Sequence, residues 1–327
     1  MRAVVCDGYG APEDVLRLAE VDEPAIGDDE VLVRVHAASV NPADWHIIRG
    51  DPYLARLSFG LRKPSVGVPG CDVAGQVEEA GRNVTTLRPG DEVFGSPFMH
   101  GFGAFAERAS VSAGLLEPKP ANLSFQQAAA VPLAACTALQ GLRDHGRLES
   151  GQKVLIIGAS GGVGTFAVQI AAALGAEVNG VCSTRNVDLV RSLGAARVVD
   201  YTTEDATAHG QSYDLILQVS GTHSPSDCRR ALTSNGTLVS ISGDSDGRWI
   251  GAVARLVKAR LTSPFVRQKL TSFTVKPNRD DLRFLKQLIE ADRMTPVIDR
   301  SYGLDEVPAA LRYLEEGHAR GKVVVTV

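Results

Sequence analysis

The chain has 327 residues, of which 44% are hydrophobic and 22% are charged, and its formal net charge at pH 7 is −4. At roughly 100–200 residues per domain, this length predicts two domains of ordinary globular composition. The chain has no run of basic residues and no long uninterrupted apolar segment, so we expect neither nucleic acid nor a membrane as a partner.

The N-terminus, MRAVVCDGYG, lacks the long apolar stretch of a signal peptide. The cysteines are odd in number and form no C-x-x-C pair, which predicts free thiols in a reducing cytoplasm. They are Cys6, Cys71, Cys136, Cys182 and Cys228.

The first third of the chain is rich in short strand patterns. Residues 30–40 alternate apolar and polar side chains, and 72–81 and 91–96 are further strand candidates between turns rich in glycine. Few helices are indicated before Gln126. This region is expected to form a compact, mostly antiparallel β domain.

Strands and helices alternate from residue 153 onward. The apolar strand 153–158 precedes a helical pattern at 163–174, and helical patterns at 186–194 and 224–236 separate later strands at 177–182, 197–200, 214–219 and 237–242. This order predicts βαβ units and a parallel sheet covered on both faces. Beyond Gly243 we expect helices at 247–261, 280–291 and 304–317, and strands at 270–275 and 321–327.

The glycine-rich turn Gly158–Gly164 lies between that first parallel strand and its helix. Glycines let the backbone approach a pyrophosphate, and the helix N-terminus presents unpaired N–H groups. Ala159 stands where G-x-G-x-x-G has its first glycine. The alternative is a turn without ligand. The residues predicted to bind the cofactor here are Ser160, Gly161, Gly162 and Val163.

The residues after the second parallel strand select the cofactor. NAD-binding proteins usually place an acid there, whereas this chain has Ser183, Thr184 and Arg185. Hydroxyls and a guanidinium suit a 2′-phosphate, so we expect NADPH. The alternative is that Arg185 is merely solvated and Asn186 caps the next helix.

The motifs NPAD, PGCDVAG, RPGDEVFG and the glycine turn, spread over nearly the whole chain, resemble those of the medium-chain dehydrogenase/reductase superfamily. More narrowly, the chain resembles the zinc-independent quinone oxidoreductase branch. The resemblance implies an α/β protein with a GroES-like β domain at 1–122, completed by 276–327. It also implies a doubly wound Rossmann NADP-binding domain with a parallel sheet at 123–275.

The resemblance also indicates that no metal is bound. The three catalytic ligand positions of zinc-bearing relatives correspond to Asn41, Cys71 and Leu133, and no cysteine lies between 72 and 135 to form the structural zinc loop. One cysteine cannot form a three-ligand zinc site. We therefore expect Cys71 to be a small buried residue.

Without zinc, oxidation of a simple alcohol is difficult, but hydride transfer to an electrophilic acceptor stays feasible. The candidate catalytic residues are Asn41, as an amide donor to substrate or cofactor, His46 and Tyr53 as proton donors, and Asp44, which orients the loop. His46 and Tyr53 have packing roles as their alternatives.

The resemblance implies further cofactor contacts, each of which has a turn or core role as its alternative. They are Thr137, Tyr201, Gly221, Gly243, Thr274, Val275 and Lys322.

The sequence thus predicts an NADPH-dependent reductase of quinones or related electrophilic carbonyl compounds. An enone or enoyl reductase and a non-catalytic NADPH-binding protein are the alternatives. Relatives often pair along Rossmann edge strands, so we also expect a cytoplasmic homodimer.

Overall fold

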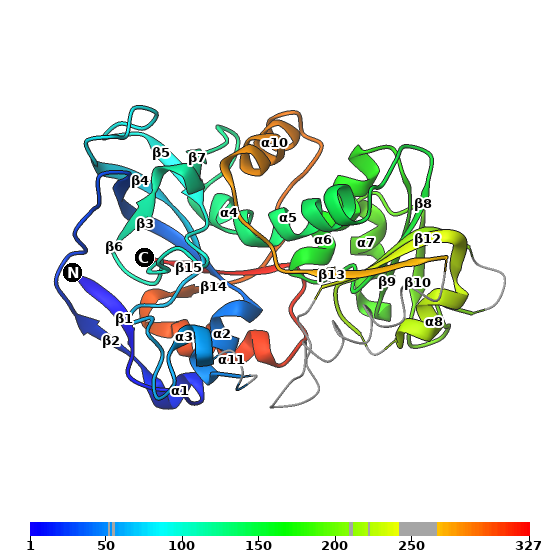
Figure 1. Cartoon of the computed structure of the whole chain (residues 1–327), viewed down its shortest axis with the longest axis horizontal. Coiled ribbons are helices and arrows are strands. Elements are labelled where there is room, and N and C mark those ends of the chain that lie inside the picture. Colours follow the sequence, from blue (N-terminus) through cyan, green and yellow to red (C-terminus); the bar gives the residue numbers. More distant parts are fainter. Residues whose placement is uncertain (52, 54–55, 209–211, 222, 242–266) are drawn as a thin grey trace. The chain divides into compact units, whose positions relative to one another are not determined.

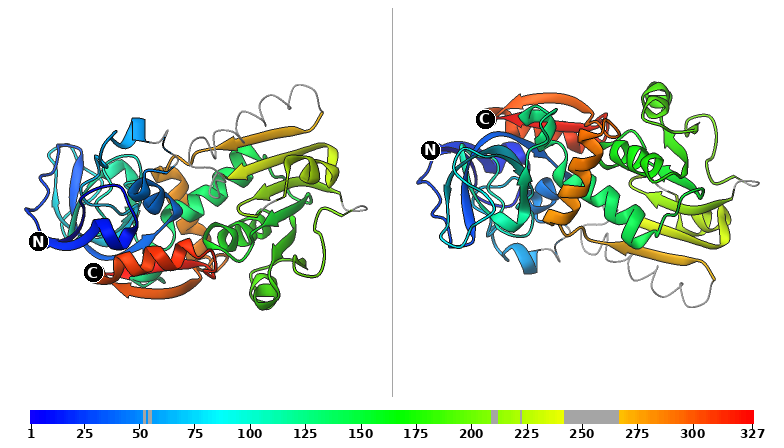
Figure 2. Two further views of the ribbon diagram at one scale, coloured as in Figure 1. Left: turned by 90° about the horizontal axis from the view of Figure 1, so that it is seen from below. Right: turned by 90° about the horizontal axis from the view of Figure 1, so that it is seen from above.

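The computed structural model describes residues 1–51, 53, 56–208, 212–221, 223–241 and 267–327 (Figure 1). They form two compact units, Met1–Cys136 with Lys276–Val327, and Thr137–Val275. Both termini therefore belong to the first unit (Figure 2). Within this described part of the chain, no helix is long and apolar enough to cross a membrane.

The first unit contains a seven-stranded sheet in the order β14-β15-β3-β4-β5-β7, with β6 also paired to β3. All its strand pairs are antiparallel except β14 with β15. Because β15 pairs with β3, the C-terminus completes the β domain, which confirms the predicted GroES-like architecture. The strands are β3 (Glu30–Val40), β4 (Asp72–Ala80), β5 (Glu92–Gly95), β6 (Arg108–Ser112), β7 (Leu116–Pro118), β14 (Ile298–Gly303) and β15 (Lys322–Thr326), beside a separate hairpin of β1 (Arg2–Cys6) and β2 (Leu16–Glu20).

Helix α2 (Pro42–Arg49) was missed by the sequence analysis, which treated this segment as a loop. Its start and end are nevertheless encoded locally. Pro42 occupies the first helical turn, the Asp44 carboxylate accepts from the Asn41 backbone N–H at 2.8 Å, and Gly50 ends the helix at φ 61°. The other helices of this unit are α1 (Pro12–Val15), α3 (Arg56–Phe59), α4 (Phe125–Ala129), α10 (Arg279–Glu290) and α11 (Val307–Glu315).

The units divide at 136/137, whereas the sequence analysis placed the first domain boundary at 122/123. The reason is that α4 packs against β3, β4 and β15 of the first unit. The packing of α4 also explains the burial of β3. The sequence pattern indicated alternating burial along this strand, but most of its second half is buried on both faces.

The second unit is a parallel sheet in the order β10-β9-β8-β11-β12-β13. Counted along the chain this is the order 3-2-1-4-5-6 of a dinucleotide-binding sheet, which confirms the predicted Rossmann-like fold. The strands are β8 (Lys153–Ile157), β9 (Glu177–Cys182), β10 (Arg197–Asp200), β11 (Tyr213–Gln218), β12 (Leu232–Ile241) and β13 (Lys269–Phe273).

Helix α6 (Gly162–Ala173) packs on β8 and β9, and α7 (Val187–Ser192) packs on β9 and β10. Helix α8 (Pro225–Arg230) ends earlier than predicted, because β12 already begins at Leu232. Helix α5 (Pro132–Leu139) continues into a π-helical turn, Gln140–His145. The basic helix predicted at 247–261 lies outside the described residues.

Candidate active site

A cluster of buried polar side chains lies where β3, β4, β15 and α2 of the first unit converge. Strand β3 pairs with both β4 and β15, with Ser39 opposite Asp72 and Val40 opposite Val323. This register brings together residues distant in sequence, and all are at most 3% exposed. The members of this Asp72 cluster are Ser39, Asn41, Asp44, Cys71, Asp72 and Lys322.

The Asp72 carboxylate is the centre of the hydrogen bonds. It accepts from Ser39 Oγ at 2.8 Å, from Asn41 Nδ2 at 2.9 Å and from the Leu133 backbone N–H at 2.9 Å. The Lys322 ammonium lies 3.6 Å from Asp72 Oδ2 and donates to the Val40 carbonyl and to Asn41 Oδ1. Lys322 therefore holds an interior position, rather than the phosphate- or adenosine-binding position predicted for it.

The role predicted for Asn41 also changes. Its side-chain amide donates one hydrogen to Asp72 and the other to the Ser39 carbonyl at 3.3 Å. An asparagine amide has two donors, so none is left to reach a substrate or cofactor in this arrangement. Asn41 instead links the Lys322 ammonium to the Asp72 carboxylate.

Burial dominates the ionisation of the cluster. It raises the pKa of Asp44 to about 7, although the Cys71 thiol and the Asn41 N–H hydrogen-bond to the carboxyl group and oppose the shift. Burial likewise raises the pKa of the Cys71 thiol well above its ordinary value, and Asp44 adds to the rise. The pKa of Lys322 is lowered by burial and raised again by Asp72. Cys71 therefore remains a neutral thiol.

His46 and Tyr53 are partly buried and have identifiable neighbours. The Nδ1 atom of His46 lies 2.8 Å from the Asp51 carbonyl, and the ring stacks on Trp45 at 3.7 Å. A carbonyl only accepts, so the hydrogen of this contact lies on Nδ1. The Arg56 guanidinium lies 4.5 Å from the centre of the Tyr53 ring.

The cofactor-binding residues predicted in the second unit follow the carboxyl ends of its parallel strands. The glycine turn follows β8, Ser183 follows β9, Tyr201 follows β10, Gly221 follows β11 and Thr274–Val275 follow β13. Carboxyl ends of parallel strands meet at one edge of the sheet, where dinucleotides bind in this fold. Thr137 lies instead in α5, and Gly243 is outside the described residues.

The glycines of the predicted pyrophosphate-binding turn have different surroundings. A Cβ on Gly164 would lie 2.0 Å from the Gly158 carbonyl oxygen, so this glycine lets the helix pack onto the turn. A Cβ on Gly161 would meet only an ordinary contact at 3.6 Å, so the space beside Gly161 is open. Gly161 is also the N-cap of α6 and provides no side-chain cap, which suits a bound anion at the helix N-terminus.

The turn after β9 is the segment predicted to contact the adenosine ribose. Ser183 precedes a short 3-10 turn, Thr184–Asn186, on which Thr184 and Arg185 are exposed. The Asn186 side chain does not cap α7; its Nδ2 donates to Ser160 Oγ at 3.0 Å and to Ser183 Oγ at 3.3 Å. Asn186 thus occupies the N-cap position of α7, but its side chain makes no capping hydrogen bond there.

One acidic residue near this turn was missed. The sequence analysis found no acid directly after β9, but Asp200 ends the neighbouring strand β10 and is the register partner of Cys182, the last residue of β9. Asp200 could have been found by pairing the two predicted strands 177–182 and 197–200, whereas the usual spacing from the glycine turn does not point to it.

Known proteins resemble the chain over its whole length. Residues 27–121 match the model of the alcohol dehydrogenase GroES-like domain, and residues 193–325 match that of zinc-binding dehydrogenases. The chloroplast envelope quinone oxidoreductase homolog of Arabidopsis thaliana is 32% identical over 336 residues, covering 99% of this chain and 98% of the relative. The chain belongs to the medium-chain dehydrogenase/reductase family. It is an enzyme of the quinone oxidoreductase-like kind.

Two further similarities concern activity and fold. The NADPH-dependent alkenal/one oxidoreductase of Arabidopsis thaliana is 34% identical, covering 99% of this chain and 79% of the relative. The quinone oxidoreductase structure from Coxiella burnetii has a TM-score of 0.86 at 31% identity and covers 100% of this chain and 99% of that one. This medium-chain reductase is thus an oxidoreductase with a nicotinamide cofactor.

The family's three catalytic metal-ligand positions contribute different groups here. Asn41 Oδ1 accepts from an ammonium, Cys71 is a neutral thiol, and Leu133 contributes a backbone N–H. In the part of the chain that the structure describes, no three His, Cys, Asp or Glu side chains form a group able to hold a metal ion. The donor set does not fit zinc, which needs a thiolate, a neutral imidazole or a carboxylate.

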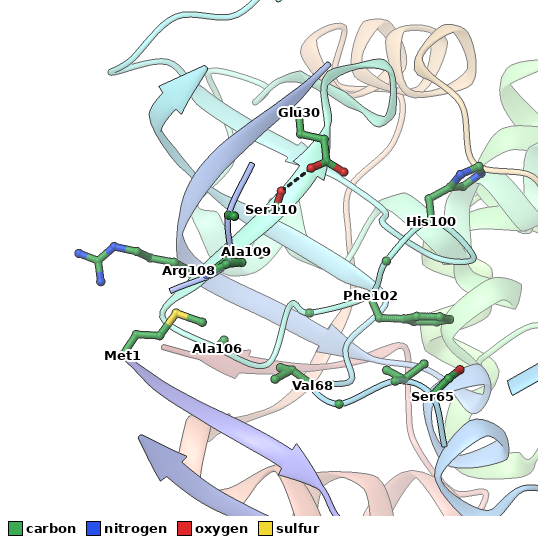
Figure 3. Close-up of a pocket in the computed structure, with 16 residues that line it drawn as sticks. Met1, Glu30, Ser65, Val68, His100, Phe102, Ala106, Arg108, Ala109 and Ser110 are labelled. Carbon is green, nitrogen blue, oxygen red and sulfur yellow. Dashed lines mark hydrogen bonds between the residues drawn. The ribbon is translucent and has the colours of Figure 1, made fainter. Parts of the chain in front are cut away.

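The first unit of this reductase also has a surface pocket of about 530 Å³ (Figure 3). Glu30 and Ser110 lie on its wall, and Ser110 Oγ donates to the Glu30 carboxylate at 2.9 Å. None of the residues predicted for catalysis or cofactor binding lines this pocket, so we assign it no part in the reaction.

Proposed function

We propose that this medium-chain reductase transfers hydride from NADPH to quinones, without zinc. The observation that carries the proposal is the row of predicted cofactor residues along one edge of the Rossmann-like sheet, with Arg185 exposed beside the adenosine turn. A guanidinium recognises a phosphate by charge-assisted hydrogen bonds. The relatives named quinone oxidoreductase support the acceptor class.

The glycine turn would hold the pyrophosphate on the α6 N-terminus, and the residues after β9 would hold the adenosine ribose and its phosphate. The bound nicotinamide supplies the hydride. The Asp72 cluster fixes the start of α2, since Asn41 is its N-cap and is held by Lys322 and Asp72. Helix α2 in turn carries His46, the candidate group for exchanging a proton with a reduced acceptor.

A second activity, reduction of the C=C bond of enones, is supported by the relative named alkenal/one oxidoreductase. Conjugation makes both acceptor classes electrophilic, so one site can serve either. A screen of NADPH consumption with quinones, enones and aldehydes tests both. Tight NADPH binding without turnover of any acceptor would instead support the non-catalytic alternative.

Arg185→Ala tests the cofactor. Loss of a charge-assisted hydrogen bond of roughly 1.5–3 kcal/mol should raise the KM for NADPH by about 10- to 150-fold. The KM for NADH should stay nearly unchanged. Equal use of both cofactors by the wild type, or equal loss of both in the variant, refutes the NADPH assignment.

Zinc independence, a homodimer and a cytoplasmic location complete the proposal. Elemental analysis should find no stoichiometric zinc, and chelators should leave activity intact; one tightly bound zinc whose removal abolishes activity contradicts this.

Strands β10 and β13 are the edges of the described Rossmann sheet and are candidates for pairing with a second copy. Light scattering at micromolar concentration should therefore give a dimer mass.

A further inference from the structure

The turns after β9 and β10 are joined by hydrogen bonds around Asp200. The Asp200 Oδ1 atom accepts from the Thr202 backbone N–H at 3.0 Å and from Thr202 Oγ1 at 2.8 Å. Thr202 Oγ1 lies 3.0 Å from Thr184 Oγ1, which places the hydroxyl of the turn after β9 against that of the turn after β10. We call Thr184, Asp200 and Thr202 the Asp200 bridge.

The Asp200 carboxylate accepts from one threonine in each of the two turns, Thr184 and Thr202. The pKa of Asp200 is lowered first by a hydrogen bond from the Thr184 hydroxyl, then by the Thr202 N–H, with smaller contributions from the Thr202 hydroxyl and the Thr184 N–H. Asp200 is therefore an ionised carboxylate whose charge is met by donors from both turns.

An ionised carboxylate at this edge ordinarily favours NADH, because it accepts from the ribose 2′-OH and repels a 2′-phosphate. That effect would oppose Arg185. Here the threonine donors engage the carboxylate, with both Thr202 hydrogen bonds on Oδ1, and tie it to the turn that carries Arg185. The same turn is held on its other side by Asn186, which donates to Ser160 and Ser183.

We propose that Asp200 is a positioning residue for NADPH selection, not a ribose acceptor. The Asp200 bridge holds the Ser183–Thr184–Arg185 turn in its phosphate-binding conformation and keeps the carboxylate engaged with Thr184 and Thr202. This inference rests on the proposed NADPH function. It adds a determinant of cofactor choice that lies one strand away from the usual position.

Thr202→Val tests the bridge, because it removes both hydroxyl contacts while keeping the size and branching of an exposed side chain. The measured quantity is the ratio of kcat/KM for NADPH to kcat/KM for NADH in the same preparation, which does not depend on the fraction of folded enzyme. Because the bridge acts on the cofactor only through the turn, the ratio should fall by less than for loss of a direct contact, by about 3- to 10-fold. Thr202→Ser, which keeps the hydroxyl, should restore it.

Thr203→Val is the matched control. The Thr203 hydroxyl donates to the Asp200 backbone carbonyl, at 3.2 Å, and not to the carboxylate, so its removal leaves the carboxylate contacts in place. A ratio for Thr202→Val that equals the control or exceeds the wild type overturns the inference alone. A wild type without NADPH preference overturns the proposed cofactor and the inference together, before any variant is made.

Discussion

Replacing the buried ammonium of the Asp72 cluster should destabilise the first unit strongly. Lys322→Met leaves the fully buried Asp72 carboxylate without its counter-charge, and breaking such a pair costs about 3–5 kcal/mol. Three donors remain on Asp72, and methionine fills a similar volume, so we expect the lower end of that range, about 3 kcal/mol.

Urea denaturation followed by tryptophan fluorescence measures this loss. In a Trp249→Phe background the signal comes from Trp45, which packs against the hydrophobic core of the first unit. Lys63→Met, at an exposed lysine, is the control and should change the free energy of unfolding by less than about 0.5 kcal/mol.

The double variant Lys322→Met/Asp72→Asn separates charge pairing from packing. If the two side chains interact, the double variant loses less stability than the sum of the single losses, by about 1 kcal/mol or more. Additive losses, or a loss below about 1 kcal/mol for Lys322→Met, would show that the ammonium and the carboxylate do not stabilise one another.

Three more predictions follow from the site. Asp44 has a folded-state pKa of about 7 against an ordinary 3.8, so the folded protein binds the extra proton and the free energy of unfolding should fall as pH rises from about 4 to about 7. Asp44→Asn should flatten this slope in urea titrations at several pH values; a slope equal to the wild type's contradicts the assignment. Gly161→Ala should leave the melting temperature nearly unchanged and raise the KM for NADPH, whereas Gly164→Ala should lower the melting temperature, because only the second Cβ would clash with backbone, at 2.0 Å. His46→Gln and Tyr53→Phe should each slow turnover of enones more than of quinones, and unchanged rates with both acceptors would leave these residues with packing roles.

Much of the fold could be predicted because its signals are local. The glycine turn between an apolar strand and an amphipathic helix identifies β8 and α6, and the observed bounds of β3, β9 and β10 match the sequence pattern. Helix α2 was equally local, with Asn41, Pro42 and Gly50 at its ends, but its motif was interpreted as a catalytic loop before its capping residues were considered.

The Asp72 cluster could not be predicted in this way. Asn41 and Lys322 are 281 residues apart in sequence and meet only because β15 pairs with β3. No sequence pattern gives that register, and without it Asn41 looks like a free donor and Lys322 like a phosphate ligand. The residue types were identified correctly, but the partners that decide their chemistry were not.

Asp72 and Asp200 show the same physical rule in opposite environments. The first is fully buried and the second is partly exposed, yet each carboxylate accepts from several donors. Strand pairing brings Ser39 to Asp72, whereas Thr202 lies two residues after Asp200 in the same turn. A carboxylate that accepts from several donors of its own chain holds those donors in place. An acid near the ribose therefore indicates NADH only when it is positioned to accept from the 2′-OH. If Thr184 and Thr202 hold the Asp200 carboxylate as we propose, that acid is compatible with the NADPH preference that Arg185 predicts.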